Sequence, residues 1–280
     1  MILGDREQVY ENIRAAVKRK DFNAKVEPMD PKLGKEDKER ILRRYLEYRN
    51  TFGYRVKRKI AQAAFSMGTS AVGLITQVSG LENLAGLHGP AIITCNHFSP
   101  LDPVIIRYSM KKAGLKRICI VNQDTNLAMK GVIGYMQRYA DTMPVSSIRW
   151  FMEKEFPAQI KSALDNNSYV LIYPEQEMWF NYRKPRPLKR GAYMYAVRFA
   201  VPIIPLFVEQ IESGSYRNGR KKISYRLHIL PVIYPPTGMN ERSSSIVMMQ
   251  KDYEQKCRAY SDAYGKKLVY DFEKGDVAGR

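Results

Sequence analysis

The sequence is organised around the stretch Asn96-His97-Phe98-Ser99-Pro100-Leu101-Asp102, in which a histidine and an aspartate stand five positions apart. The apolar run Ala91-Ile92-Ile93-Thr94-Cys95 precedes this stretch, and Pro103 follows it. An apolar run of strand length that ends in a polar corner with proline is typical of a buried strand that delivers a loop to the edge of a sheet. A short helix is expected next, with Asp102 as its N-cap and Pro103 as its first residue.

His97 and Asp102 are expected to touch, because one leaves the strand and the other begins the next helix. A neutral imidazole can accept a proton near pH 7, and a carboxylate on its other nitrogen fixes the tautomer. We therefore interpret His97 and Asp102 as a catalytic pair that deprotonates a hydroxyl of the substrate, a role that requires no metal. The plain alternative is that Asp102 only caps a helix and His97 only closes a loop.

The cysteines give a weaker signal. Cys95, Cys119 and Cys257 are too few and too scattered for a disulfide framework or a zinc site, and their number is compatible with a reducing cytosol. Cys95 stands two positions before His97, so a catalytic thiol is an alternative. It is disfavoured because nothing basic besides His97 is placed to activate it.

Further motifs accompany the His–Asp corner. Residues 78–84 lie shortly before it, Tyr173-Pro174-Glu175 ends a later apolar run, and residues 201–206 read Val-Pro-Ile-Ile-Pro-Leu. In this order and spacing the set resembles the glycerolipid acyltransferase family, whose best-known members are lysophosphatidic acid acyltransferases. The resemblance covers about half of the chain, from residue 76 to residue 205.

The resemblance implies transfer of a fatty acyl chain from acyl-CoA or acyl carrier protein to a hydroxyl of a lysophospholipid, as in phospholipid biosynthesis. The expected acceptor is 1-acyl-glycerol-3-phosphate. His97 is then the general base and Asp102 orients it, and no cofactor beyond the acyl thioester is expected. Asn96, Ser99 and Glu175 are expected to bind substrate, with Glu175 holding polar groups of the acceptor.

The sequence departs from the family where phosphate would bind. The family follows Pro-Glu with Gly-Thr-Arg, and this chain has Gln176-Glu177-Met178 instead. A glycine and an arginine are lost, and the Glu177 carboxylate would repel a phosphate at close range. The family has a second arginine, which holds the phosphate of the acceptor. This chain has Ser146 or Ser147 near that position, and Arg149 follows slightly later. A different lysolipid or a glycolipid is therefore the alternative acceptor.

A basic loop offers a compensation. Residues 181–192 contain several cations and no acid. Arginine forks suit phosphate, so Arg183, Lys184, Arg186 and Lys189 are expected to bind the phosphate of the acceptor. The alternatives are a solvated loop and a loop that rests on anionic lipid.

Charge and hydropathy indicate an anionic membrane surface as a partner. The formal net charge is +18 and the sequence pI is about 9.7. Residues 1–75 are predicted to form a basic, helical membrane-associating segment without a signal peptide. A basic aromatic helix followed by the uncharged residues 60–75 predicts a hairpin in the headgroup layer, because the uncharged run is too weakly apolar to span. The expected location is peripheral, on the cytoplasmic side of a membrane. The alternative is a helix that packs on the domain with a solvated basic face.

Residues 76–280 are predicted to form an α/β domain with a mixed, largely parallel sheet flanked by helices, led by the N-terminal helical extension. Residues 76–84 are predicted to form a strand and a turn. Apolar runs predict further strands at 91–95, 116–121, 143–146, 169–173, 201–208 and 223–229, and helical periods predict helices at 127–139, 147–167, 189–200 and 240–272. The last of these helices is expected to be amphipathic, with Ile246, Met249 and Tyr253 on its apolar side.

Two other classes of function compete with the enzyme. A non-catalytic lipid-binding protein on the same fold would explain the basic surface and would ask nothing of His97. Nucleic-acid binding is suggested by charge alone. Because the sequence has neither zinc-finger spacing nor an RRM aromatic signature, no nucleic-acid partner is expected.

Overall fold

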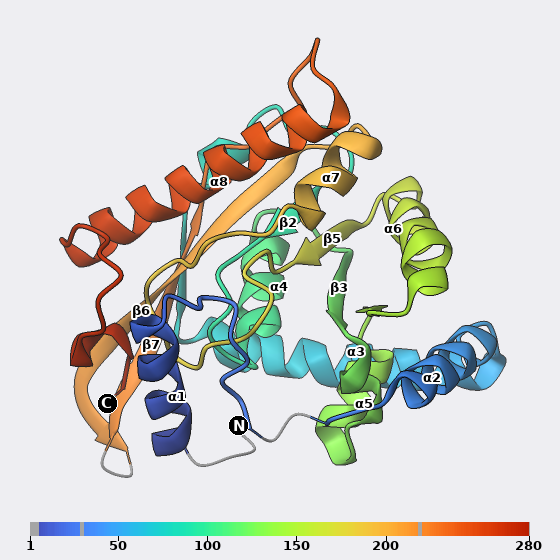
Figure 1. Ribbon diagram of the computed structural model, residues 1–280, viewed down its shortest axis with the longest axis horizontal. Helices are drawn as coiled ribbons and strands as arrows, with labels where there is room; N and C mark the ends of the chain where they lie inside the picture. The colour runs from blue at the N-terminus through green and yellow to red at the C-terminus, as the bar shows by residue number, and fades with distance from the viewer. Residues whose placement is uncertain (1–5, 29–30, 218–219, 280) are drawn as a thin grey trace.

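A seven-stranded sheet forms the centre of the computed structural model, which describes residues 6–28, 31–217 and 220–279 (Figure 1). The strand order is β1-β7-β6-β2-β5-β3-β4, and each neighbouring pair is parallel except β6 and β7. The predicted mixed, largely parallel sheet is therefore confirmed. The strands are β1 (Thr76–Ser79), β2 (Ile92–Thr94), β3 (Ile118–Gln123), β4 (Thr142–Val145), β5 (Tyr169–Ile172), β6 (Ile203–Arg217) and β7 (Arg220–Ile229).

Helices cover both faces of this sheet. One core holds side chains of α6 (Phe156–Asp165), α7 (Gly191–Arg198) and α8 (Glu241–Tyr264), and the other holds side chains of α3 (Phe52–Gly73) and α4 (Asp102–Lys112). Successive residues of a strand point to opposite faces, and so Ile92 joins the first core while Ile93 joins the second. Burial on both faces explains why the central strands are continuously apolar.

Two predicted helices are divided in the structure. The helix expected at 127–139 is a 3-10 turn at Asp124–Ala128 followed by α5 (Gly131–Tyr139), separated near Gly131, whose φ is +66°. The helix expected at 147–167 is a π-helical turn at Phe151–Glu155 followed by α6. Pro157 explains the irregularity, because it has no N–H to donate to the preceding turn.

The N-terminal segment is not one structural unit. Helix α1 (Arg6–Lys18) shares a separate apolar core with Trp179, Tyr182 and Val277, so it packs on the loop that follows β5. Helix α2 (Lys35–Tyr48) precedes α3, and the break between them is capped by Thr51, which accepts a hydrogen bond from the N–H of Tyr54. The predicted break between a basic helix and an uncharged helix near residue 60 is wrong, since both parts lie in α3.

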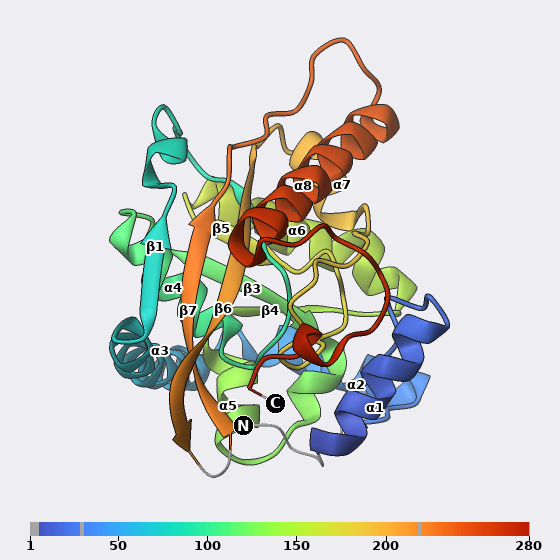
Figure 2. The same cartoon turned by 90° about the vertical axis from the view of Figure 1, so that its left-hand side faces the viewer.

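The C-terminal segment folds back from the end of α8 over the same loop (Figure 2). Helix α8 ends at Tyr264 and is followed by Gly265, which has the left-handed φ of 61° that favours glycine, so the helix is shorter than predicted. Beyond it, the N–H of Arg183 donates to the carbonyl of Asp276 at 2.8 Å, and Asn181 exchanges two hydrogen bonds with Ala278. Both ends of the described chain therefore brace the loop after β5.

Candidate active site

The His–Asp corner follows the carboxyl end of β2. His97 Nδ1 lies 2.9 Å from Asp102 Oδ2, and the same oxygen accepts the N–H of Phe98 at 2.9 Å. The predicted contact is therefore present. The prediction that Asp102 caps the helix is wrong: α4 begins at Asp102 itself, with Leu101 in the N-cap position. Oδ2 of the buried carboxylate bonds the corner, and the side chain makes no capping hydrogen bond to the helix amides.

The imidazole is held in one orientation. The Asp102 carboxylate can only accept a hydrogen bond from His97 Nδ1, so we assign the ring proton to Nδ1. His97 Nε2 is then left as a hydrogen-bond acceptor. The ring stacks on Tyr173, with ring centroids 4.0 Å apart and an interplanar angle of 17°. Within the described ranges no side chain or backbone group is hydrogen-bonded to Nε2, and His97 lines a cavity of about 570 Å³. The arrangement can remove a proton from a group bound in that cavity.

Burial raises the pKa of the Asp102 carboxyl above its ordinary value of 3.8, although its hydrogen bonds with His97 and the backbone act in the opposite direction. At pH values between the ordinary pKa of 3.8, which applies to the unfolded state, and the raised pKa of the folded state, the folded state binds more protons than the unfolded state. This group therefore lowers the free energy of unfolding as the pH rises through that window.

Asp102→Asn is expected to reduce turnover by about 10²- to 10⁴-fold, because an amide can neither fix the tautomer as well nor stabilise the imidazolium. The variant should not lose stability relative to the wild type as the pH rises above 3.8, since it has no buried charge to form. Steady-state kinetics and urea unfolding at several pH values measure both. Unchanged turnover would contradict the assignment of Asp102 as the orienting group.

The loop after β5 holds the backbone of the corner. The N–H of His97 donates to Glu175 Oε2 at 3.2 Å, and the carbonyl of His97 accepts the N–H of Trp179 at 3.1 Å. The N–H of Asn181 donates to the carbonyl of Phe98 at 2.8 Å. The carboxyl ends of β2 and β5 thus meet at one edge of the sheet, where α/β proteins usually bind ligands.

Glu175 and Arg186 form a buried ion pair beneath this loop. Arg186 Nη2 lies 2.9 Å from Glu175 Oε2, and the N–H of Arg186 donates to Oε1 at 2.9 Å. Arg186 is 1 % exposed, its Nη1 donates to the carbonyl of Phe22 at 3.0 Å, and its guanidinium lies 4.6 Å from the centre of the Trp179 ring. The pair joins the N-terminal segment, the loop and the corner, and neither residue lines the cavity.

The chain is similar to known proteins in sequence and in structure. The model of the acyltransferase family matches residues 75–209, which include the His–Asp corner and the Pro174-Glu175 turn. The domain formed by these residues belongs to the acyltransferase family. A crystal structure of the 1-acyl-sn-glycerophosphate (LPA) acyltransferase PlsC from Thermotoga maritima is similar to this chain. The match covers 90% of this chain and 97% of the PlsC chain, with 16% sequence identity and a TM-score of 0.46. No curated protein matches the chain.

The other predicted substrate-binding residues of the acyltransferase have partners within the chain. The amide of Asn96 bonds both backbone groups of Val208, at 3.1 and 2.8 Å. Ser99 lines the cavity, and its Oγ accepts the N–H of Leu101 at 3.1 Å. Of the residues predicted to contact substrate, the structure therefore brings His97, Ser99 and Lys189 to the cavity wall.

The basic loop does not present the expected phosphate site. Arg183 Nη2 lies 2.9 Å from Glu212, and Lys184 Nζ lies 2.7 Å from Asp276, as Arg186 is paired with Glu175. The loop itself has no acid, but the fold supplies one to each of these three cations, whereas Lys189 lines the cavity. Arg183, Lys184 and Arg186 are thus engaged in holding the loop, and none of the three lines the cavity.

Cys95 is fully buried in the acyltransferase, and its thiol donates to Asn96 Oδ1 at 3.4 Å. Burial raises the pKa of the Cys95 thiol well above its ordinary value. The thiolate that a nucleophile requires is therefore disfavoured at neutral pH.

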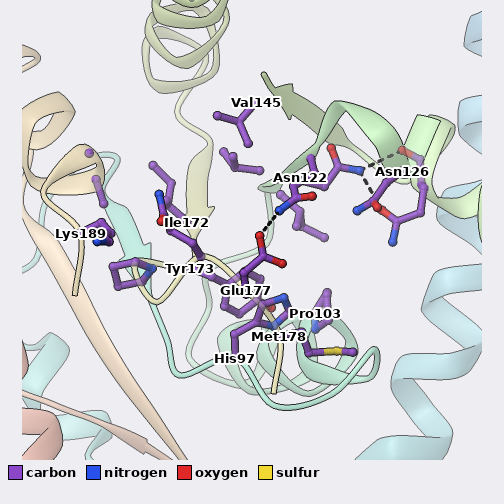
Figure 3. Close-up of a pocket in the computed structure, with 18 of the residues that line it drawn as sticks. His97, Pro103, Asn122, Asn126, Val145, Ile172, Tyr173, Glu177, Met178 and Lys189 are labelled. Atoms are coloured by element: carbon purple, nitrogen blue, oxygen red, sulfur yellow. Dashed lines mark hydrogen bonds between the residues drawn. The ribbon is translucent and has the colours of Figure 1, made fainter. Parts of the chain in front are cut away.

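The cavity has an apolar part and a polar wall (Figure 3). The apolar part is lined by Ile120, Val121, Met129, Ile133, Val145, Met152, Phe156, Ile172, Met194 and Tyr195. The polar wall includes Asn122 and Gln123 at the end of β3, which the sequence analysis did not single out. The signal was present: both residues directly follow the apolar run 118–121, at the carboxyl end of a predicted parallel strand.

Proposed function

We propose that this acyltransferase moves a fatty acyl chain from acyl-CoA or acyl carrier protein to a hydroxyl of a lysolipid, as glycerolipid acyltransferases do. The observation that supports this most is the oriented His97, whose Nε2 has no hydrogen-bond partner among the described residues and which lines a largely apolar cavity. Among acceptors, 1-acyl-glycerol-3-phosphate is the one that the family resemblance favours, and another lysolipid or a glycolipid is the alternative.

In the proposed reaction, His97 Nε2 takes the proton of the acceptor hydroxyl as its oxygen attacks the thioester carbonyl. Asp102 stabilises the imidazolium that forms. When the tetrahedral intermediate collapses, the carbon–sulfur bond breaks, the ester forms, and His97 returns the proton to the leaving thiolate. Every proton is conserved, and the acyl thioester supplies the driving force.

A transfer assay tests the proposal directly. Purified protein with labelled palmitoyl-CoA or palmitoyl-acyl carrier protein is expected to label at least one member of a panel of lysolipids. Vesicle binding without transfer from either donor would instead favour a non-catalytic lipid-binding protein.

We also propose that the enzyme docks peripherally on an anionic membrane through α3, on the cytoplasmic side. No helix within the described residues is both long and apolar enough to cross a bilayer. Helix α3 nevertheless exposes apolar side chains at helical spacing, and exposed cations, Arg55 and Lys59, lie among them. These side chains are Phe52, Val56, Ile60 and Met67, with Leu74 directly after the helix. An exposed apolar stripe among cations suits the headgroup layer of a membrane.

Ile60→Glu/Met67→Glu is expected to weaken binding to phosphatidylglycerol vesicles by at least about tenfold, because each change replaces buried apolar contact with a charge of the wrong sign. Vesicle co-sedimentation measures this. Val269→Glu, which changes an exposed apolar residue outside α3, is the matched control and should bind as the wild type does. Equal binding by all three proteins would exclude α3 as the docking element.

A further inference from the structure

Amide side chains dominate the polar wall of the cavity. They come from the end of β3, the following 3-10 turn, α5 and the loop after β5, and they are Asn122, Gln123, Asn126, Gln137 and Gln176. Asn122 Nδ2 donates to Gln137 Oε1 at 2.8 Å, and Gln123 Nε2 donates to Glu177 Oε1 at 2.8 Å. These contacts hold the wall in place from several elements at once.

The charges on the cavity wall do not suit a phosphate. The charged side chains among the described lining residues are Glu27, Glu177 and Lys189, and no arginine is among them. In Figure 3, Glu177 rises from its loop above His97 toward Asn122, and Lys189 lies on the far side of the opening. A phosphate near the amide wall would face the Glu177 carboxylate at close range.

The backbone at Gln176 gives independent support. Gln176 has a φ of +68°, in the left-handed region that favours glycine, and the family has glycine at this position. Glycine would adopt this conformation without the strain that a Cβ causes. A strained residue whose side chain lines a site points to a use for that side chain, and the amide of Gln176 lines the cavity.

Building on the proposed acyl transfer, we propose that the acceptor carries an uncharged, hydroxyl-rich headgroup, a sugar or another polyol, and not a phosphate. Hydroxyl groups both donate and accept hydrogen bonds, as amides do, and a carboxylate such as Glu177 adds a strong acceptor. A neutral headgroup also loses less hydration free energy on entering the cavity than a phosphate without a paired cation. The amide wall holds this headgroup while its acyl chain and the donor chain use the apolar part.

The test compares two monoacylated acceptors, a 1-acyl-glucosylglycerol and 1-acyl-glycerol-3-phosphate, with palmitoyl-CoA as donor. The wild type is expected to use the sugar acceptor with a kcat/KM at least about tenfold higher, the factor expected from one close like-charge repulsion. Glu177→Gln keeps the shape and removes the charge, so it should raise kcat/KM for the phosphate acceptor by roughly tenfold. Glu254→Gln removes an exposed charge on α8, outside the cavity, and should change neither value.

A measurement of acceptor binding distinguishes a wrong headgroup assignment from a wrong proposed reaction. Calorimetry on His97→Ala with hexanoyl versions of both acceptors needs no turnover. Tighter binding of the sugar acceptor supports the headgroup assignment even if no transfer is seen, in which case the proposed reaction fails. Equal or tighter binding of the phosphate acceptor, or its preferred use by the wild type, overturns the headgroup assignment and leaves acyl transfer standing.

Discussion

Replacing His97 with alanine is expected to abolish acyl transfer, lowering kcat/KM by about 10⁴-fold or more, as the loss of a base in a hydrogen-bonded catalytic unit does. Among the described lining residues, His97 is the one histidine, and its imidazole is the nitrogen base that we expect to accept the hydroxyl proton. Asp102 cannot substitute for it, because the carboxylate is fully buried and bonded to the Phe98 N–H. Transfer of label from palmitoyl-CoA under single-turnover conditions measures the chemical step.

The fold of this variant should survive. The His97 ring lies at the cavity wall, and Asp102 can take up a proton when its partner is lost, because burial already raises its pKa. His88→Ala is the matched control, since His88 is exposed and precedes β2. Circular dichroism should show both variants folded, with transfer lost in one of them. Transfer at the wild-type rate by folded His97→Ala would end the proposed mechanism.

Arg186→Ala is expected to lower the free energy of unfolding by about 3–5 kcal/mol, because removing one partner leaves the buried Glu175 carboxylate uncompensated. The carbonyl groups of His97, Phe22 and Glu177 lose a donor in the same step. The loop would then no longer hold the corner, so transfer should fall as well. Urea unfolding gives the stability change, and transfer at low temperature gives the activity of the folded fraction.

Two further variants test whether the loss of stability comes from breaking the Glu175–Arg186 ion pair or from removing any cation of the loop. Glu175→Gln/Arg186→Met removes both charges and should lose less stability than Arg186→Ala alone, because no buried charge is left unpaired. Arg190→Ala changes an exposed cation of the same loop and should stay within about 0.5 kcal/mol of the wild type. If Arg186→Ala unfolded like the wild type and only weakened phosphate-acceptor use, the phosphate-binding interpretation of Arg186 would stand.

Local sequence was sufficient for the elements that depend on neighbours along the chain. The run 91–95 predicted β2, and the spacing of His97 and Asp102 predicted their contact, because a short loop leaves few ways to arrange two side chains five positions apart. The same kind of pattern predicted the strands at 169–173 and 201–208. Helix boundaries were less accurate, because Gly131 and Pro157 act on single turns inside otherwise helical periods.

Helix α8 shows where periodicity was misleading. The pattern favoured a face with Ile246, Met249 and Tyr253, yet the buried side of the helix includes Asp252 and Lys256. These two residues form an ion pair four positions apart, and Asp252 also accepts hydrogen bonds from Thr94, at 2.6 Å, and from Tyr193. Charged residues can be buried only when such partners are supplied, and these partners lie on β2 and α7.

The sequence by itself determined the class of fold, the contact between His97 and Asp102 and the resemblance to acyltransferases, since these rest on apolar runs and on short spacings. The tertiary structure alone decided the roles of the basic loop and of the N-terminal segment. Lys184 donates a hydrogen bond to Asp276, which lies 92 positions away in the sequence, and Trp179 donates one to the carbonyl of Ala24, 155 positions away. The free energy of a charge depends on what surrounds it after folding, so a cation that appeared free to bind phosphate is instead part of the support of the active site.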